Sequence, residues 1–173
     1  MASVIFFRAV NVGGHQKFQP SLLAKELAAL DVVNLGAAGT FVVRATTTAP
    51  KLRTAIHARL HFQPELMICP APAVLALVKS DPYRDIPVTD DMTRYVSILP
   101  KALRTAPKMP PDFPTPGHWE VRLLGITGPF VLSLQRPGKK GLYPNALVEK
   151  QFCLPATTRN WNTLVKIAEV LKS

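Results

Sequence analysis

Short strand-like and helix-like segments alternate in a fixed order along the first half of the chain. Segments rich in Val, Ile and Phe predict strands over residues 3–8, 32–35, 41–47 and 65–69. Leucine and isoleucine at helical spacing predict helices that begin near Pro20 and Pro50. The order strand, helix, strand, strand, helix, strand is the split βαβ pattern of ferredoxin-like folds.

A similar but looser series follows in the second half. Strands are predicted over residues 94–99, 119–124 and 130–135, the last two as a hairpin, and helices over 144–152 and 163–172. Residues 100–116 contain six prolines and are expected to form an extended surface segment. The predicted fold class is α+β, with two tandem ferredoxin-like subdomains whose helices pack on mixed or antiparallel sheets. Their predicted bounds are residues 1–80 and 94–173, joined by a polar link over 81–93.

The last helix has a clear apolar face. Trp161, Leu164, Val165 and Ala168 recur at helical spacing and are predicted to pack inward. Lys166 and Lys172 are predicted to stay in water.

Composition indicates a globular chain with a basic surface. Of 173 residues, 47% are hydrophobic, and 21 Lys and Arg against 11 Asp and Glu give a formal charge of +10. Such a field attracts phosphates and other anions. The first residues lack the pattern of a signal peptide, and no apolar run is long enough to span a membrane, so we expect a cytoplasmic protein.

Familiar catalytic and cofactor patterns are missing from the sequence. Cys69 and Cys153 form no CxxC, and His57 and His61 have no third ligand beside them, so neither metal nor redox cofactor is indicated. There is no phosphate loop, dinucleotide fingerprint, GxSxG elbow or paired catalytic carboxylate. Whether the protein is an enzyme is left open.

The first segment that could carry function is RAVNVGG, residues 8–14. Arg8 and Asn11 precede Gly13 and Gly14, at which backbone amides can approach a ligand closely. The alternative is a turn that only needs glycine for positive φ angles.

The second such segment is ATTRNWNT, residues 156–163, at the predicted start of the last helix. Thr158 or Asn160 can cap that helix. Arg159, Asn160 and Asn162 exceed what capping needs, and a helix start with a forked guanidinium suits a phosphate or carboxylate. Alternatively, these side chains tie the helix to the other half of the chain.

These two segments carry a family resemblance. RAVNVGG followed by a leucine helix, and TTRNWNTLVKIAEVL at the end, resemble the signature segments of the bacterial family called domain of unknown function 1697. The resemblance implies two tandem α+β subdomains and leaves the activity open. The chain departs from the family pattern at Ala9, where glycine is usual, and over NLGAAGT, residues 34–40, where only Gly39 matches well.

We expect the two segments to meet and form an anion-binding site of eight residues: Arg8, Asn11, Gly13, Gly14, Thr158, Arg159, Asn160 and Asn162. Its partner would be a nucleic acid or a phosphate-bearing small molecule, without a membrane partner or a cofactor. A small-molecule enzyme or sensor with its site between the halves, and a structural or assembly module without a ligand, are the alternatives.

Overall fold

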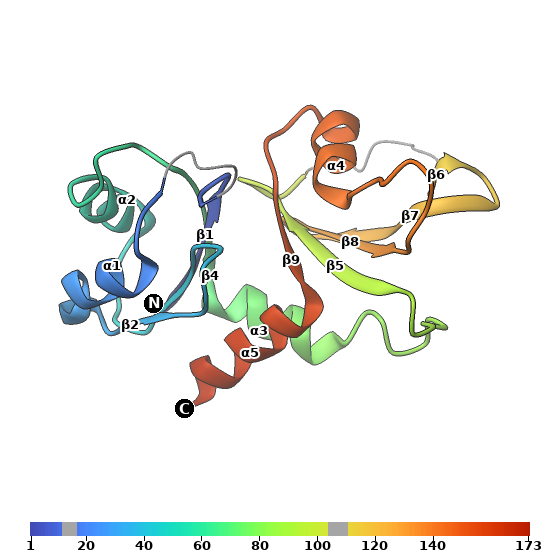
Figure 1. Ribbon diagram of the computed structural model, residues 1–173. Helices are drawn as coiled ribbons and strands as arrows, with labels where there is room; N and C mark the ends of the chain where they lie inside the picture. The colour runs from blue at the N-terminus through green and yellow to red at the C-terminus, as the bar shows by residue number, and fades with distance from the viewer. Residues whose placement is uncertain (12–16, 104–110) are drawn as a thin grey trace. The chain divides into compact units, whose positions relative to one another are not determined.

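The computed structural model describes residues 1–11, 17–103 and 111–173, and its backbone divides into two compact units (Figure 1). Unit 1 comprises residues 1–79 and 163–173, and unit 2 comprises residues 80–162. Each unit contains one antiparallel sheet with helices, so the α+β class is confirmed. Residues 163–173 group with unit 1, although they lie at the end of the second half of the sequence. The predicted subdomain bounds, residues 1–80 and 94–173, stay a prediction.

Unit 1 follows the predicted order of elements. Its elements are β1 (Ser3–Arg8), α1 (Pro20–Glu26), the 3-10 turn η1 (Ala28–Leu30), β2 (Val32–Asn34), β3 (Thr40–Val43), α2 (Ala49–His57), β4 (Glu65–Pro70) and α3 (Ala71–Ser80). The sheet order is β2-β3-β1-β4, and every neighbouring pair is antiparallel.

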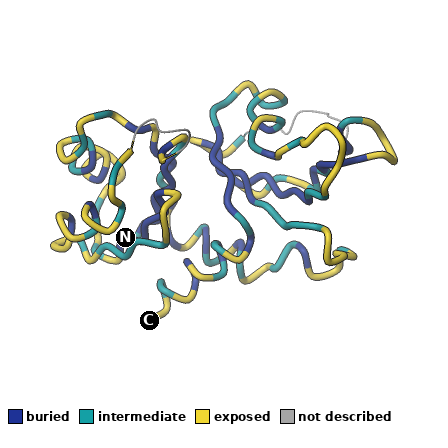
Figure 2. Tube along the Cα trace, viewed as in Figure 1, coloured by how far each residue is buried: buried dark blue, intermediate teal, exposed yellow. Residues whose placement is uncertain are grey.

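Both faces of this sheet are covered. Ile5 and Phe7 of β1 pack with Leu23 of α1 and Leu52 of α2 on one face. Phe6 points to the other face because side chains alternate along a strand, and it is fully buried as well. Buried residues are concentrated in the strands, as Figure 2 shows.

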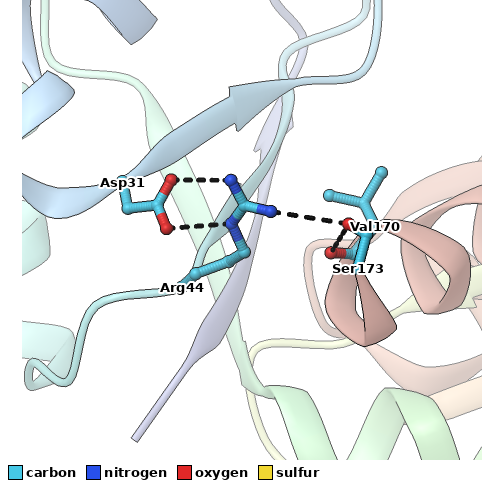
Figure 3. Close-up of polar contacts among 4 residues, drawn as sticks. All are labelled: Asp31, Arg44, Val170 and Ser173. Carbon is cyan, nitrogen blue, oxygen red and sulfur yellow. Dashed lines mark hydrogen bonds and ion pairs between the residues drawn. The ribbon is translucent and has the colours of Figure 1, made fainter.

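The end of the last helix, α5 (Trp161–Lys172), is tied to unit 1 by Arg44 (Figure 3). Arg44 binds both carboxylate oxygens of Asp31, at 2.9 and 2.8 Å, and its Nη1 lies 3.5 Å from Ser173 Oγ. Ser173 Oγ in turn donates to the carbonyl of Val170. The hydrogen bond and charge of Asp31 raise the pKa of Arg44, which therefore stays a cation beside a helix C-terminus, where positive charge is favourable.

The inward face of α5 agrees with the sequence pattern at most positions. Trp161, Leu164 and Ala168 are buried, and Lys166 and Lys172 are exposed, which confirms those predictions. Val165 is half-buried, whereas Ile167 is completely buried, so the face is rotated slightly from the one predicted.

Unit 2 is built on a five-stranded sheet. Its elements are β5 (Thr93–Ile98), β6 (Asp112–Thr115), β7 (His118–Thr127), β8 (Phe130–Gln135), α4 (Pro144–Phe152) and β9 (Thr157–Asn160), followed directly by α5. The strand order is β6-β7-β8-β5-β9, again antiparallel throughout. The predicted β7–β8 hairpin and the helix over 144–152 are confirmed. Val148 of α4 packs with Val121 and Val131 on one face of the sheet.

Two sequence predictions in unit 2 need correction. Residues 157–160 form an edge strand rather than the start of a helix, because they pair with β5 from Ile98↔Thr157 to Tyr95↔Asn160. The described part of the proline-rich segment is mostly exposed, as predicted, but residues 112–115 form β6, which pairs with β7 and buries Asp112 and Phe113. Pro114 is tolerated there because β6 is an edge strand.

Within the described parts of the chain, no helix has the length and apolar character needed to cross a membrane.

Candidate functional site

Arg8 ends β1 opposite Glu65, the first residue of β4. Its Nη1 donates to Glu65 Oε2 at 2.9 Å, and both side chains are partly exposed. Arg8 was predicted to bind an anionic ligand, but its positive charge is paired here with the carboxylate of Glu65.

Asn11 holds two neighbouring segments of unit 1 together. Its Nδ2 donates to the carbonyl of Ala37 at 2.9 Å, and its Oδ1 accepts from the backbone N–H of Phe18 at 3.0 Å. Its backbone is left-handed, with φ of 55°, a conformation that asparagine tolerates better than most residues. Both ends of this amide have structural partners. Gly13 and Gly14 lie outside the described residues.

The backbone explains two glycine positions in the family resemblance. Gly39 has φ of +68°, and its carbonyl accepts from the N–H of Phe7 at 2.8 Å. A Cβ at this position would lie 2.6 Å from Phe7 Cβ, so only glycine fits between the 34–40 loop and β1. Ala9 also has a left-handed backbone, with φ of 53°, at a position that the family usually fills with glycine. Both positions are explained by folding, without a ligand.

Thr158 and Asn160, in the second predicted segment, also have structural contacts. Ser97 Oγ lies 2.6 Å from Thr158 Oγ1, which donates to Asn145 Oδ1 at 2.9 Å. Asn160 Oδ1 accepts from the N–H of Asn162 at 2.9 Å, which identifies Asn160 rather than Thr158 as the cap of α5. These residues form a polar network at the junction of β9 and α5.

Arg159 lies in the middle of this network. The residue is only 9% exposed, and its Nη1 donates to Thr157 Oγ1 at 2.7 Å and to the carbonyl of Thr158 at 3.0 Å. Burial lowers the pKa of Arg159 to about 10, which still leaves it a cation at neutral pH. A buried guanidinium thus stands two residues before the first turn of α5.

The structure brings four of the eight predicted residues together: Thr158, Arg159, Asn160 and Asn162 are consecutive or nearly so around the β9–α5 junction. Arg8 and Asn11 belong to unit 1. That the two segments form one site stays a prediction.

Sequence reasoning overlooked several polar groups that the fold places in contact. Ser97 and Asn145 come from β5 and α4, far from Thr158 in sequence. Glu120 and Trp119 of β7 contact the loop that follows β8, and that loop contains the adjacent basic residues Lys139 and Lys140, from which no site was predicted. Among the described residues, no group of three or more His, Cys, Asp and Glu side chains could hold a metal ion.

A shallow cavity of about 230 Å³ lies in unit 1 between α1 and the turn after α2. Phe18, Leu22 and Leu60 give it an apolar wall, with Glu26 and Arg59 also in its lining. None of the six described residues of the predicted site lines it.

Comparison with known proteins identifies the family. A search of curated proteins found no match. The solved structure of the conserved bacterial protein SP0830 from Streptococcus pneumoniae is similar in fold, with a TM-score of 0.65 and 15% identity over 98% of both chains. Residues 1–110 match the family described as "Protein of unknown function (DUF1697)", so the match includes RAVNVGG but not the segment at the end of the chain. The chain belongs to the DUF1697 family.

Proposed function

We propose that the protein binds a phosphate-bearing anionic ligand at the junction of β9 and α5. The observation that carries this proposal is the position of Arg159, a guanidinium buried against the backbone just before a helix begins. Burying a cation is costly unless its interactions compensate, so a buried arginine often has a role beyond solubility.

The surroundings of Arg159 favour an anion as ligand. The first backbone N–H groups of a helix carry partial positive charge, and here the helix begins two residues after Arg159. A guanidinium offers forked donors that match a phosphate. The formal charge of +10 would raise the local concentration of such a ligand, whether a nucleic acid or a small molecule.

The N-terminal segment contributes less in this proposal than the sequence suggested. Arg8 is paired with Glu65, and the Asn11 side chain is engaged at both ends. Arg159 is therefore the principal cation of the proposed site. Arg8, Gly13 and Gly14 would add to it only if the two segments meet.

A second candidate is a structural or assembly module without a ligand. It is favoured by the same contacts, because Asn11, Thr158 and Asn160 all bind other parts of the chain. Under this alternative, the polar side chains of both segments serve folding alone.

The test is titration of inorganic phosphate, nucleotides and short RNA and DNA against the wild type and three variants. Arg159→Gln removes the charge, Arg159→Lys keeps it without the fork, and Arg84→Gln removes an exposed charge elsewhere in unit 2. We expect Arg159→Gln to weaken binding of at least one ligand by about tenfold or more, Arg159→Lys to weaken it less, and Arg84→Gln to match the wild type. If wild type binds none of these ligands, or if folded Arg159→Gln binds as well as Arg84→Gln, the structural module is the better explanation.

We also propose that the two units are tandem copies of the ferredoxin-like split βαβ pattern. Support comes from strand order: β4-β1-β3-β2 in unit 1 corresponds to β9-β5-β8-β7 in unit 2. Unit 2 differs in its extra edge strand β6 and in having no helix between β5 and β7 among the residues described there. An experimental structure that defines residues 104–110 tests whether the missing crossover helix exists.

A further inference from the structure

The loop between β8 and α4 has the sequence RPGKKG, residues 136–141, and both of its ends are fixed to Glu120 of β7. The N–H of Arg136 donates to the Glu120 carbonyl at 2.8 Å. At the other end, the N–H groups of Lys140 and Leu142 donate to the two Glu120 carboxylate oxygens at 2.8 and 2.9 Å. A Cβ at Gly138 would overlap the Glu120 side chain, so the loop needs glycine there. One carboxylate therefore sets the shape of a basic loop.

Arg136 is held in place by Trp119. Its guanidinium carbon lies 4.3 Å from the centre of the indole ring, and its Nε donates to the Trp119 carbonyl at 2.6 Å. Trp119 is itself buried, so it is a rigid support. Among the residues described, neither terminal nitrogen of Arg136 has a hydrogen-bond partner, and the two remain available as a forked donor pair.

The acidic groups near this loop are already engaged. Asp112 accepts two bonds from Arg122, at 2.6 and 3.0 Å, and the Glu120 carboxylate accepts from the loop backbone. Lys139 and Lys140 are exposed and follow Arg136 closely in the chain. Among the described residues no ion pair joins Arg136, Lys139 or Lys140 to a carboxylate, although the charge of Arg136 acts on Asp112 and that of Lys140 acts on Glu120. The loop therefore presents three cations without a direct carboxylate partner, and Arg136 is immobilised before any ligand arrives.

We propose that residues 136–140 bind the phosphate backbone of a nucleic acid. Arg136 contacts one phosphate through its two terminal nitrogens, and Lys139 and Lys140 contact its neighbours along the strand. Fixing the arginine in advance lowers the entropy cost of binding. Small phosphate ligands need an enclosing concave site, whereas an exposed loop with successive cations matches a polymer with successive charges. This surface shares no residue with the β9–α5 junction and does not depend on the function proposed there.

The experiment measures binding of fluorescently labelled single-stranded RNA and double-stranded DNA of mixed sequence to the full chain, over a series of salt concentrations. One test variant combines Lys139→Gln with Lys140→Gln, at two exposed positions. The other is Arg136→Lys, which keeps the charge but loses the forked pair of donors. A charge-matched control combines Lys101→Gln with Lys150→Gln, two exposed lysines elsewhere in unit 2.

We expect the double loop variant to bind at least about tenfold more weakly than its charge-matched control. Its plot of log affinity against log salt should also be less steep, by about 1.4 to 1.8 in slope, because each of the two lost phosphate contacts contributes about 0.7 to 0.9 to the steepness. Arg136→Lys should weaken binding although the net charge is unchanged. Three results would overturn the proposal: equal affinities for the double loop variant and its charge-matched control, Arg136→Lys binding as tightly as wild type, or a wild type that binds anionic phospholipid vesicles but no nucleic acid. Because Arg159 is intact in every loop variant, failure here is distinguishable from failure at the β9–α5 junction.

Discussion

Replacing Gly39 with alanine should be among the most destabilising small substitutions in this protein. A left-handed backbone costs a residue with a Cβ about 1–2 kcal/mol. The new Cβ would also lie 2.6 Å from Phe7 Cβ, 2.9 Å from Phe7 Cγ and 3.1 Å from Val10 Cγ2. Phe7 is buried and stacks on Phe18 with ring centres 5.2 Å apart, so it has little room to move. Overpacking of this kind costs about 1–3 kcal/mol, giving a total loss of about 2–5 kcal/mol.

The assay is urea unfolding at equilibrium, followed by circular dichroism, with Gly36→Ala as the matched control. Gly36 lies in the same loop and also has positive φ, +103°, but nothing lies within 4 Å of its added Cβ. Its substitution should therefore show the backbone cost without the clash. A Gly39→Ala protein as stable as Gly36→Ala would show that Phe7 and Val10 yield at no cost, and the close packing of the 34–40 loop on β1 would be refuted.

Four further results are expected. Ala9→Gly should stabilise the protein by about 0.5–1 kcal/mol in the same urea assay, because relief of the left-handed strain outweighs the added entropy of the unfolded chain. Leu164→Ala should cost about 2–5 kcal/mol, since the side chain is completely buried, and an unchanged urea midpoint would contradict this. A thiol reagent should modify exposed Cys153 in the native protein but Cys69 only after unfolding, because Cys69 is buried and burial raises its pKa to about 12. If the reagent still modified the folded Cys153→Ser variant, this expectation would be wrong. Hydrogen bonds from the backbone N–H groups of Leu142 and Lys140 lower the pKa of Glu120 from its ordinary 4.5. The ionised Glu120 carboxylate therefore stabilises the folded protein above pH 4.5, and this stabilisation is lost as the pH falls through the lower pKa of the folded state. Wild type should accordingly lose more stability than Glu120→Gln between about pH 6 and about pH 3, and parallel losses would contradict this.

The candidate site was only partly predictable from the sequence. Arg159 and Asn160 stand out as polar residues before an apolar helix, and the structure gives Asn160 the capping role that such a position favours. The partner of Arg8 could not be foreseen, because Glu65 lies 57 residues away and becomes its neighbour only through the β1–β4 register. The loop over 136–141 showed two adjacent lysines, but its attachment to Glu120 depends on the β7–β8 pairing.

By itself, the sequence determined most of the strands and helices, the α+β class and most of the inward face of α5. These features follow from the spacing of apolar residues, which is a local property of each segment and can be read without knowing the rest of the fold. Tertiary structure alone decided that residues 157–160 form a strand. Threonine favours strands but asparagine does not, and no apolar alternation marks these four residues, so it is their pairing with β5 that makes them a strand. It also decided which charges are neutralised and which remain available. A polar side chain takes its partner from whatever the fold brings within about 3 Å, and that neighbour is set by strand register and chain crossings rather than by local sequence.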